Sequence, residues 1–65
     1  MTDFNLLVAD LHDLGMNDSE IGRQVGSSQP NIRYLRTTPG AEPRYSLGVR
    51  LVKLHRKLTR QQQAA

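Results

Sequence analysis

The side chains best suited to recognise a partner lie in and just after one predicted helix, Gln29–Arg36. At about 100° per residue, Ile32 and Leu35 mark the buried side of that helix. The opposite side presents Pro30, Arg33, Tyr34 and Thr37. Gln29 lies at the leading end of the helix, on its flank. This arrangement predicts an exposed polar and basic strip on a short amphipathic helix.

The chemistry of this strip matches the edges of base pairs. A Gln amide can form two hydrogen bonds to adenine, and an Arg guanidinium can form two to guanine, so we expect Gln29 and Arg33 to read bases. Each such pair discriminates between bases by about 1–3 kcal/mol. Tyr34 is expected to meet a thymine methyl group or a phosphate. These residue types therefore predict a helix that enters the major groove of duplex DNA, with its first residues at the base edges.

Other basic residues around this helix would fix its position on a duplex without reading sequence. Arg23, Arg36 and Arg44 flank the strip and are expected phosphate contacts, and the Thr37 hydroxyl group at the end of the strip is a fourth. A further group lines the outer side of the last predicted helix: Arg50, Lys53, Arg56, Lys57 and Arg60. The simpler interpretation of this group is a solvated helix face, and we favour it for Lys53 and Lys57.

The charge of the chain is unevenly distributed. Its formal net charge is +3, yet residues 1–20 contain five acids and no Lys or Arg, while residues 21–65 contain nine Lys and Arg against Glu42 alone. Such asymmetry suggests a basic face for a polyanion, although a solvated basic surface without a partner would look the same. With no cysteine and no long apolar run, we expect neither disulfides nor a membrane span, and a cytoplasmic location.

Neither an enzyme nor a metal site is predicted. His12 and His55 stand alone in their segments, without the spacing of metal ligands. No nucleophile has a general base placed beside it in a motif, so we expect no catalytic residues, no cofactor, no metal and no small-molecule substrate.

Hydrophobic periodicity predicts an all-α fold, a small bundle of four or five short helices. The predicted helices are Asp3–Leu14, Asp18–Val25, Gln29–Arg36 and Leu47–Leu58. Their expected N-caps are Thr2, Asn17, Ser28 and Ser46. The expected core is Leu7, Leu11, Leu14, Ile21, Val25, Ile32, Leu35, Leu47, Leu51, Leu54 and Leu58. We assign residues 1–60 to one domain and residues 61–65 to a disordered tail.

Residues 18–37 have the pattern of a DNA-binding helix-turn-helix. Its key positions are Ile21, Gly22, Val25, Gly26, Ile32 and Leu35. A small residue at Gly22 allows close approach of the second helix, and Gly26 permits the positive φ of the turn. The alternative is a plain helical hairpin in a structural bundle.

The stretch Met16–Arg36 resembles the helix-turn-helix of the lambdoid phage repressor and Cro family, and Glu42-Pro43-Arg44-Tyr45 resembles the segment that follows it there. The resemblance implies a lambda-repressor-like fold and a dimeric regulator that binds an operator in a bacterial or phage-infected cell. It implies base-reading or groove-facing roles for Ser28, Gln29, Pro30 and Tyr34, and phosphate contacts for Asn17 and Arg44. Two departures are Asp18, where the family often has Gln, and the absence of the usual fifth helix.

We therefore expect a sequence-specific DNA-binding regulator, a Cro-like repressor whose two copies read a palindromic operator with half-sites about one helical turn apart. Val49 and Val52 fall outside the leucine stripe of the last helix and are candidates for the dimer contact. Two alternatives are a protein-interaction module, such as an antirepressor that reuses the fold, and an RNA-binding or nucleoid-type protein with little sequence preference.

Overall fold

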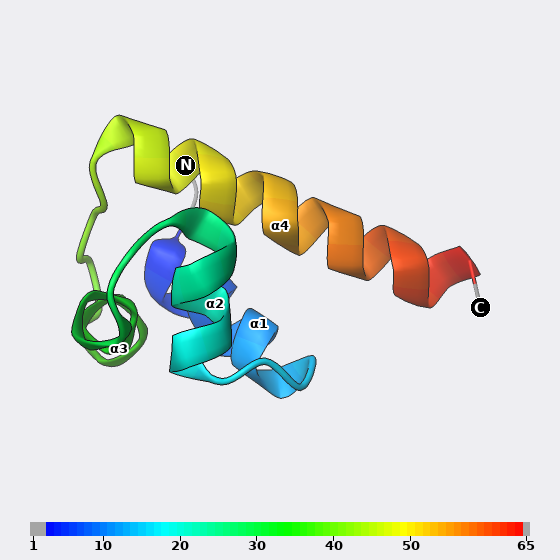
Figure 1. Cartoon of the computed structure of the whole chain (residues 1–65), viewed down its shortest axis with the longest axis horizontal. Coiled ribbons are helices and arrows are strands. Elements are labelled where there is room, and N and C mark those ends of the chain that lie inside the picture. Colours follow the sequence, from blue (N-terminus) through cyan, green and yellow to red (C-terminus); the bar gives the residue numbers. More distant parts are fainter. Residues whose placement is uncertain (1–2, 65) are drawn as a thin grey trace.

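Four helices and no strand are formed by residues 3–64, the part of the chain that this computed structural model describes. They are α1 (Phe4–Asp13), α2 (Asp18–Val25), α3 (Gln29–Thr37) and α4 (Tyr45–Ala64). Both α1 and α2 pack against α3 on one side and α4 on the other (Figure 1). The all-α bundle predicted from the sequence is confirmed, with four helices and not a fifth within these residues.

The ends of α2 and the start of α3 follow the predicted capping signals. Asn17 Oδ1 accepts a hydrogen bond from the Glu20 amide at 2.8 Å, and the Glu20 carboxylate accepts one from the Asn17 amide at 3.4 Å. This reciprocal pair satisfies two donors that the helix leaves free. Gly26 ends α2 with a φ of 73°, and Ser28 accepts a hydrogen bond from the Asn31 amide. Local sequence therefore fixes the length of the turn between α2 and α3.

The ends of α1 and α4 differ from the predictions. Asp3 caps α1 by accepting hydrogen bonds from the Asn5 and Leu6 amides, whereas the predicted cap, Thr2, lies outside the described residues. An acid suits this position because it also meets the positive end of the helix dipole. The predicted Ser46 cap is wrong, since α4 begins at Tyr45 and Ser46 lies in its first turn.

Residues 61–64, which the sequence analysis assigned to a disordered tail, continue α4. These residues are three glutamines and an alanine, all good helix formers, and no Gly or Pro separates them from the preceding turn. Ala65 lies outside the described residues. At 20 residues α4 is the longest helix, yet no helix among residues 3–64 is both long and apolar enough to cross a membrane.

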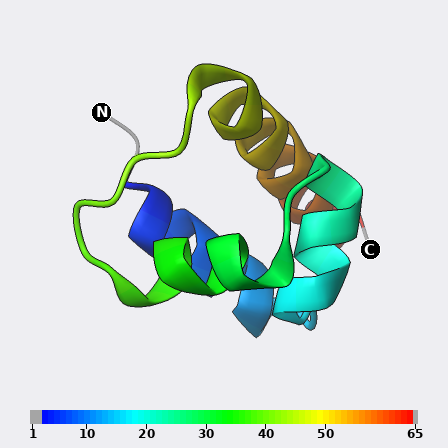
Figure 2. The ribbon, with the colours of Figure 1, turned by 60° about the vertical axis from the view of Figure 1, so that its left-hand side comes forward.

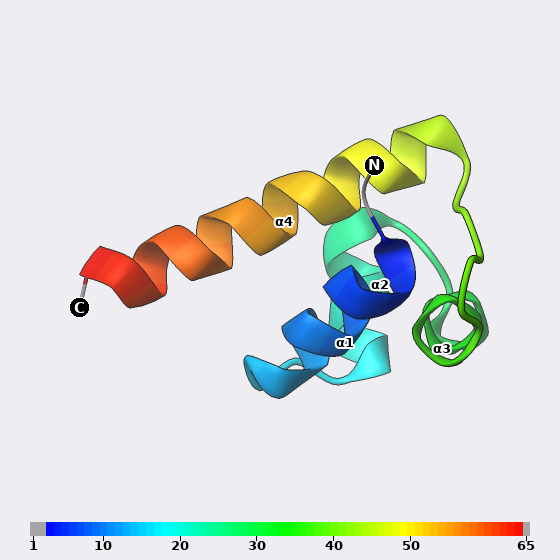
Figure 3. The same ribbon diagram turned by 180° about the vertical axis from the view of Figure 1, so that it is seen from behind.

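The core lies where the four helices meet. Its buried aliphatic side chains are Leu7, Val8, Leu11, Ile21, Val25, Ile32, Leu35, Leu47 and Leu51. Val8 was not in the predicted core, and the predicted core residues Leu14, Leu54 and Leu58 are only partly buried. Leu54 and Leu58 belong to the second half of α4. Figures 1 and 3 show that this half extends past the other helices toward the C-terminus, so fewer neighbours are available to bury its side chains.

Polar contacts that the sequence did not predict also join the helices. The Asn5 side chain of α1 donates to the Arg36 carbonyl at the end of α3, and Arg50 Nη1 of α4 donates to the Val25 carbonyl at the end of α2, at 3.2 Å. His55 Nε2 of α4 lies 2.5 Å from Asp10 Oδ2 of α1. Each contact links segments far apart in the sequence, so spacing along the chain gives no sign of it.

Gly22 sets how closely the turn can fold back onto α2. A Cβ atom built on Gly22 would lie 2.6 Å from the Ser27 carbonyl oxygen, and the Ser27 amide donates to the Gly22 carbonyl at 2.8 Å. The obstacle is backbone, which cannot rotate away as a side chain can. A glycine at this position is therefore a steric requirement of the turn.

We expect Gly22→Ala to destabilise the protein by about 1–3 kcal/mol, as overpacking does, although Ala favours an exposed helix by about 1 kcal/mol over Gly. Urea unfolding followed by circular dichroism gives the difference. Gly48→Ala is the matched control and should cost less, because its Cβ would meet the Phe4 side chain at 3.1 Å and that ring can move. A stabilised Gly22→Ala protein would contradict the steric account.

Candidate functional site

The orientation of α3 is fixed by two buried side chains. Ile32 is fully buried and Leu35 is 1% exposed, and both belong to the core that α3 shares with its neighbours. Because both side chains are buried over their whole length, α3 cannot rotate about its axis without exposing aliphatic surface to water. Every other side chain of α3 is then directed by its angle from this pair.

The predicted reading strip lies on the open side of α3. Gln29, Pro30 and Arg33 are exposed, and Tyr34 is 55% exposed, a high value for an aromatic residue. In Figure 1 α3 is seen end-on at the left edge of the molecule, with the other helices on one side of it only. Figure 2 brings this edge forward and shows α3 running across the front. The outward placement predicted for these residues is confirmed, since the described part of the chain leaves all four exposed.

The residues at the start of α2 and α3 serve the helices themselves. Asn17 and Ser28 are the N-caps of α2 and α3, and both side chains are exposed. Ser27 Oγ accepts a hydrogen bond of 2.9 Å from the Asn31 side chain, which steadies the turn before α3. The positive end of the α3 dipole therefore faces solvent beside an ordered turn. The phosphate contact expected at Asn17 stays a prediction.

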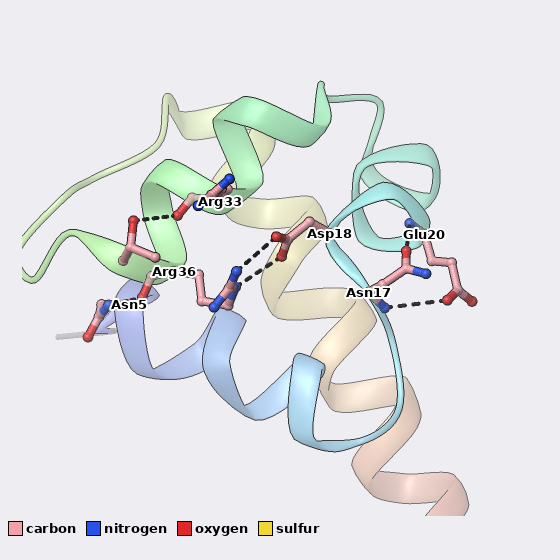
Figure 4. A network of polar contacts seen from close by, with 7 residues as sticks. Asn5, Asn17, Asp18, Glu20, Arg33 and Arg36 are labelled. Carbon is pink, nitrogen blue, oxygen red and sulfur yellow. Dashed lines mark hydrogen bonds and ion pairs between the residues drawn. The ribbon is translucent and has the colours of Figure 1, made fainter.

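Asp18 and Arg36 form a paired contact between α2 and α3. Arg36 Nε donates to Asp18 Oδ1 at 3.1 Å and Arg36 Nη2 donates to Oδ2 at 3.0 Å, the two-point geometry shown in Figure 4. This hydrogen bonding to Arg36 lowers the pKa of Asp18 from its ordinary value of 3.8, and it raises the pKa of Arg36. The Asp18 side chain is 11% exposed, so the charge is held largely out of water.

This pair involves two residues that the sequence analysis singled out. Arg36 was expected to contact phosphate, but its guanidinium is already engaged by Asp18, so we leave it out of the interface. The Asp18 carboxylate has its own partner, Arg36, 18 positions later. The Asn5 contact to the Arg36 carbonyl, also drawn in Figure 4, holds the same end of α3 from the other side.

The remaining phosphate candidates lie around α3. Arg44 is exposed beside the start of α4, where it lines a small polar hollow with Ser27 and Asn31 of the turn and α3. Thr37 is exposed at the end of α3 and donates to the Arg33 carbonyl at 2.8 Å. Arg23 is exposed on α2 and shares a surface hollow with Glu20. Of these, Arg44 shares a hollow with Asn31 in the first turn of α3.

The candidate dimer residues lie together on another face. Val49 and Val52 are half-buried and line a groove between the start of α4 and the start of α1. Its other apolar members are Phe4, Pro43, Tyr45 and Gly48. Tyr45 is 87% exposed, so the groove includes aromatic surface open to water. A contiguous apolar groove of this kind is a common feature of contact surfaces.

Sequence reasoning missed the residues that orient the site. Asn5 and Arg50 cap the ends of α3 and α2, and no local motif marks either of them. The only sequence signal for the Asp18–Arg36 pair was the opposite charge of the two residues. Charge alone does not show which of several arginines pairs with Asp18. Among the residues that the structure describes, no three His, Cys, Asp or Glu side chains come together as metal ligands would.

We expect Asp18→Asn to lower the urea midpoint at about pH 7, because the neutral amide loses the charged pair with Arg36. Since the folded-state pKa of Asp18 lies below 3.8, the carboxylate stabilises the fold above that pH and loses this effect as the pH falls through the lowered pKa. The gap between the two proteins should therefore close in acid. Asp13→Asn, at an exposed acid of α1, is the control and should change little. A gap that is independent of pH would disprove the role assigned to the charge.

Comparisons with known proteins assign no family to this geometry. No family model matches the chain, and no curated protein or solved structure matches it. The function must therefore be argued from the residues and their placement.

Proposed function

We propose that α2, the turn at residues 26–28 and α3 are a helix-turn-helix, and that α3 binds in the major groove of duplex DNA to recognise sequence. The observation that supports this most is the open outer face of α3, which combines Gln29, Arg33 and Tyr34 on a helix held by buried aliphatic residues. A major groove about 12 Å wide admits one helix. The function that follows is regulation of transcription, as a repressor of Cro-like type.

The proposed base contacts follow from the reach of each side chain. Gln29, at the leading end of α3, pairs with adenine through its amide, and Arg33, one turn later, pairs with guanine. Pro30 and Ser28 face the groove beside them and contribute packing and a hydroxyl group. Tyr34 offers an aromatic face to a thymine methyl group or its hydroxyl group to a phosphate. All five residues are exposed, as the proposal requires.

The proposed phosphate contacts place α3 in the groove. Arg44 stands beside the leading part of α3, in the polar hollow it shares with Ser27 and Asn31. Asn17, Arg23 and Thr37 are further candidates from the flanking helix ends. Cations at such positions supply affinity that depends on salt and little sequence preference.

The acids near this face support the same assignment. Asp18 on α2 is paired with Arg36 of α3, and Asp10 on α1 contacts His55 on α4, on the side of the bundle away from α3. Arg33 and Arg44 are both exposed and form no ion pair among the side chains of residues 3–61. The potential along the outer side of α3 is therefore positive, which attracts a polyanion.

Binding as two copies would suit a palindromic operator, and the apolar groove at Val49 and Val52 is the surface we propose for the contact. A chain of 65 residues buries a modest core, so covering this groove would also add stability. A two-fold contact uses the same patch on both copies, so one groove is sufficient.

A duplex selected from a random pool tests the base contacts. Gln29→Ala should weaken binding to the selected site by about 1–3 kcal/mol, roughly 5- to 150-fold, and leave random duplex binding unchanged. Arg44→Gln is the matched comparison. It should weaken both duplexes equally and reduce the log–log salt slope by about 0.9, as one phosphate contact does. Fluorescence anisotropy over a salt series measures both effects.

Other outcomes of this experiment favour other functions. Binding to RNA or random duplex as tight as to any selected site, with no effect of Gln29→Ala, would indicate a nucleoid-type or RNA-binding protein. A chain without salt-dependent binding to any nucleic acid would indicate a protein-interaction module that uses the same fold.

Sedimentation tests the dimer contact separately. We expect the protein to sediment as a dimer on its selected duplex, and Val49→Lys to convert it to a monomer, because the new cation would be buried in the contact beside Lys53 and Arg56, which have the same charge. Leu6→Ala is the control, since Leu6 is 64% exposed on α1 and does not line the groove. A monomer at high micromolar concentration, with and without DNA, would exclude this dimer.

A further inference from the structure

A row of four cations runs along the second half of α4. Its members are Lys53, Arg56, Lys57 and Arg60, and we call them the basic stripe. Their spacing of i, i+3, i+4 and i+7 places neighbouring Cβ atoms about 5–6 Å apart on one helix face. All four are exposed, and with Gln61 they line one hollow on the surface.

No acid offsets the basic stripe. The 20 residues of α4 include neither Asp nor Glu. Among the side chains of residues 3–61, the ion pairs are Asp18–Arg36 and Asp10–His55, so neither includes the stripe. Glu42 lines the apolar groove together with Lys53 and Arg56 but forms no ion pair there. A solvated helix face normally mixes charges of both signs, and this one does not.

The basic stripe costs α4 stability as an isolated helix. Like charges at i and i+4 repel, and the pairs 53–57 and 56–60 both have this spacing. Compensation by the helix dipole is weak, because that effect is confined to the last turn and the last turn of α4 has no basic residue. A polyanion would convert this repulsion into attraction.

The basic stripe and α3 face different directions. At about 100° per residue the four cations centre roughly 150° away from Leu47 and Leu51, which bury α4 in the bundle. The bundle, α3 included, lies on that buried side. Figures 1 and 3 show the half of α4 that contains the stripe, drawn in orange, extending away from α3. A duplex seated on α3 would therefore leave the stripe free.

We propose that the basic stripe is a second binding face, which holds the phosphate backbone of duplex nucleic acid without reading its sequence. A duplex suits it better than a single strand, because residues 53–61 include no Phe, Tyr or Trp on which successive bases could stack. Phe4 and Tyr45 lie only beside the first half of the stripe, in the groove that Lys53 and Arg56 also line. An anionic membrane suits it less well, because Leu54 and Leu58, the leucines in the same half of α4 as the stripe, pack against the core and are not free to insert.

One consequence concerns two duplexes at once. If α3 holds one segment of DNA, as the proposed function states, the basic stripe can hold a second and the protein can bridge them. Bridging rests on the proposed function, whereas binding by the stripe does not. The two are separated by testing the stripe in a chain whose α3 face has lost its two exposed cations through Arg33→Gln and Arg44→Gln.

The test compares two fourfold variants of the full chain in that background. The first neutralises the stripe with Lys53→Gln, Arg56→Gln, Lys57→Gln and Arg60→Gln, since Gln keeps a high helix propensity. The second exchanges the cations and keeps the charge, with Lys53→Arg, Arg56→Lys, Lys57→Arg and Arg60→Lys. Binding of a short random duplex is measured by anisotropy over a salt series, and circular dichroism checks the helix content. Lys57→Gln with Arg60→Gln alone is the milder variant if the first unfolds.

The neutralised variant should bind the random duplex at least tenfold more weakly at low salt, and the magnitude of its log–log salt slope should fall by about 3–4, or 0.9 per lost phosphate contact. The exchanged variant should match its parent. Equal affinity and slope in the neutralised chain would overturn the proposal. Loss of binding to anionic vesicles, with duplex binding unchanged, would overturn it in favour of a membrane surface. The proposed function would fail in a different way: the protein with an unchanged α3 face would bind no selected duplex, whether or not the stripe binds random duplex.

Discussion

The burial of Ile32 and Leu35 against α1 and α2 is the constraint on which the rest of the structure depends. Rotation of α3 by even a third of a turn would expose one of these side chains and cost about 1.5–3 kcal/mol of hydrophobic stabilisation. The helix therefore has one orientation, and its polar face is fixed in space before any partner arrives. Such preorganisation reduces the conformational entropy lost on binding.

The polar contacts around α3 reinforce this orientation from both ends. Ser28 and Ser27 order the start of the helix, while Asp18 pairs with Arg36 and Asn5 contacts the carbonyl groups of the last turn. The charges of Asp18 and Arg36 are therefore engaged with each other inside the protein and are not free to interact with a ligand. What remains on the outside of α3 is a neutral amide, a free guanidinium and a phenol, which are groups suited to hydrogen bonding at base edges.

Much of this could be predicted from the sequence, because the signals were local. The capping box at Asn17, the glycine turn and the spacing of Ile32 and Leu35 depend on neighbours within a few residues, and they fixed α2, α3 and the outward strip. Contacts between distant residues could not be predicted, so the engagement of Arg36 by Asp18 was missed. The length of α4 was misjudged because polar glutamines suggested a tail, although nothing in them breaks a helix.

The most direct test of the account is a nuclear magnetic resonance titration of the labelled protein with a duplex selected from a random pool, at a salt concentration that suppresses sequence-independent contacts. The account predicts that the largest shifts occur at Gln29, Arg33 and Tyr34 and in the turn before α3, and that they disappear with a scrambled duplex. Shifts confined to other surfaces, with the outer face of α3 unchanged, would contradict it.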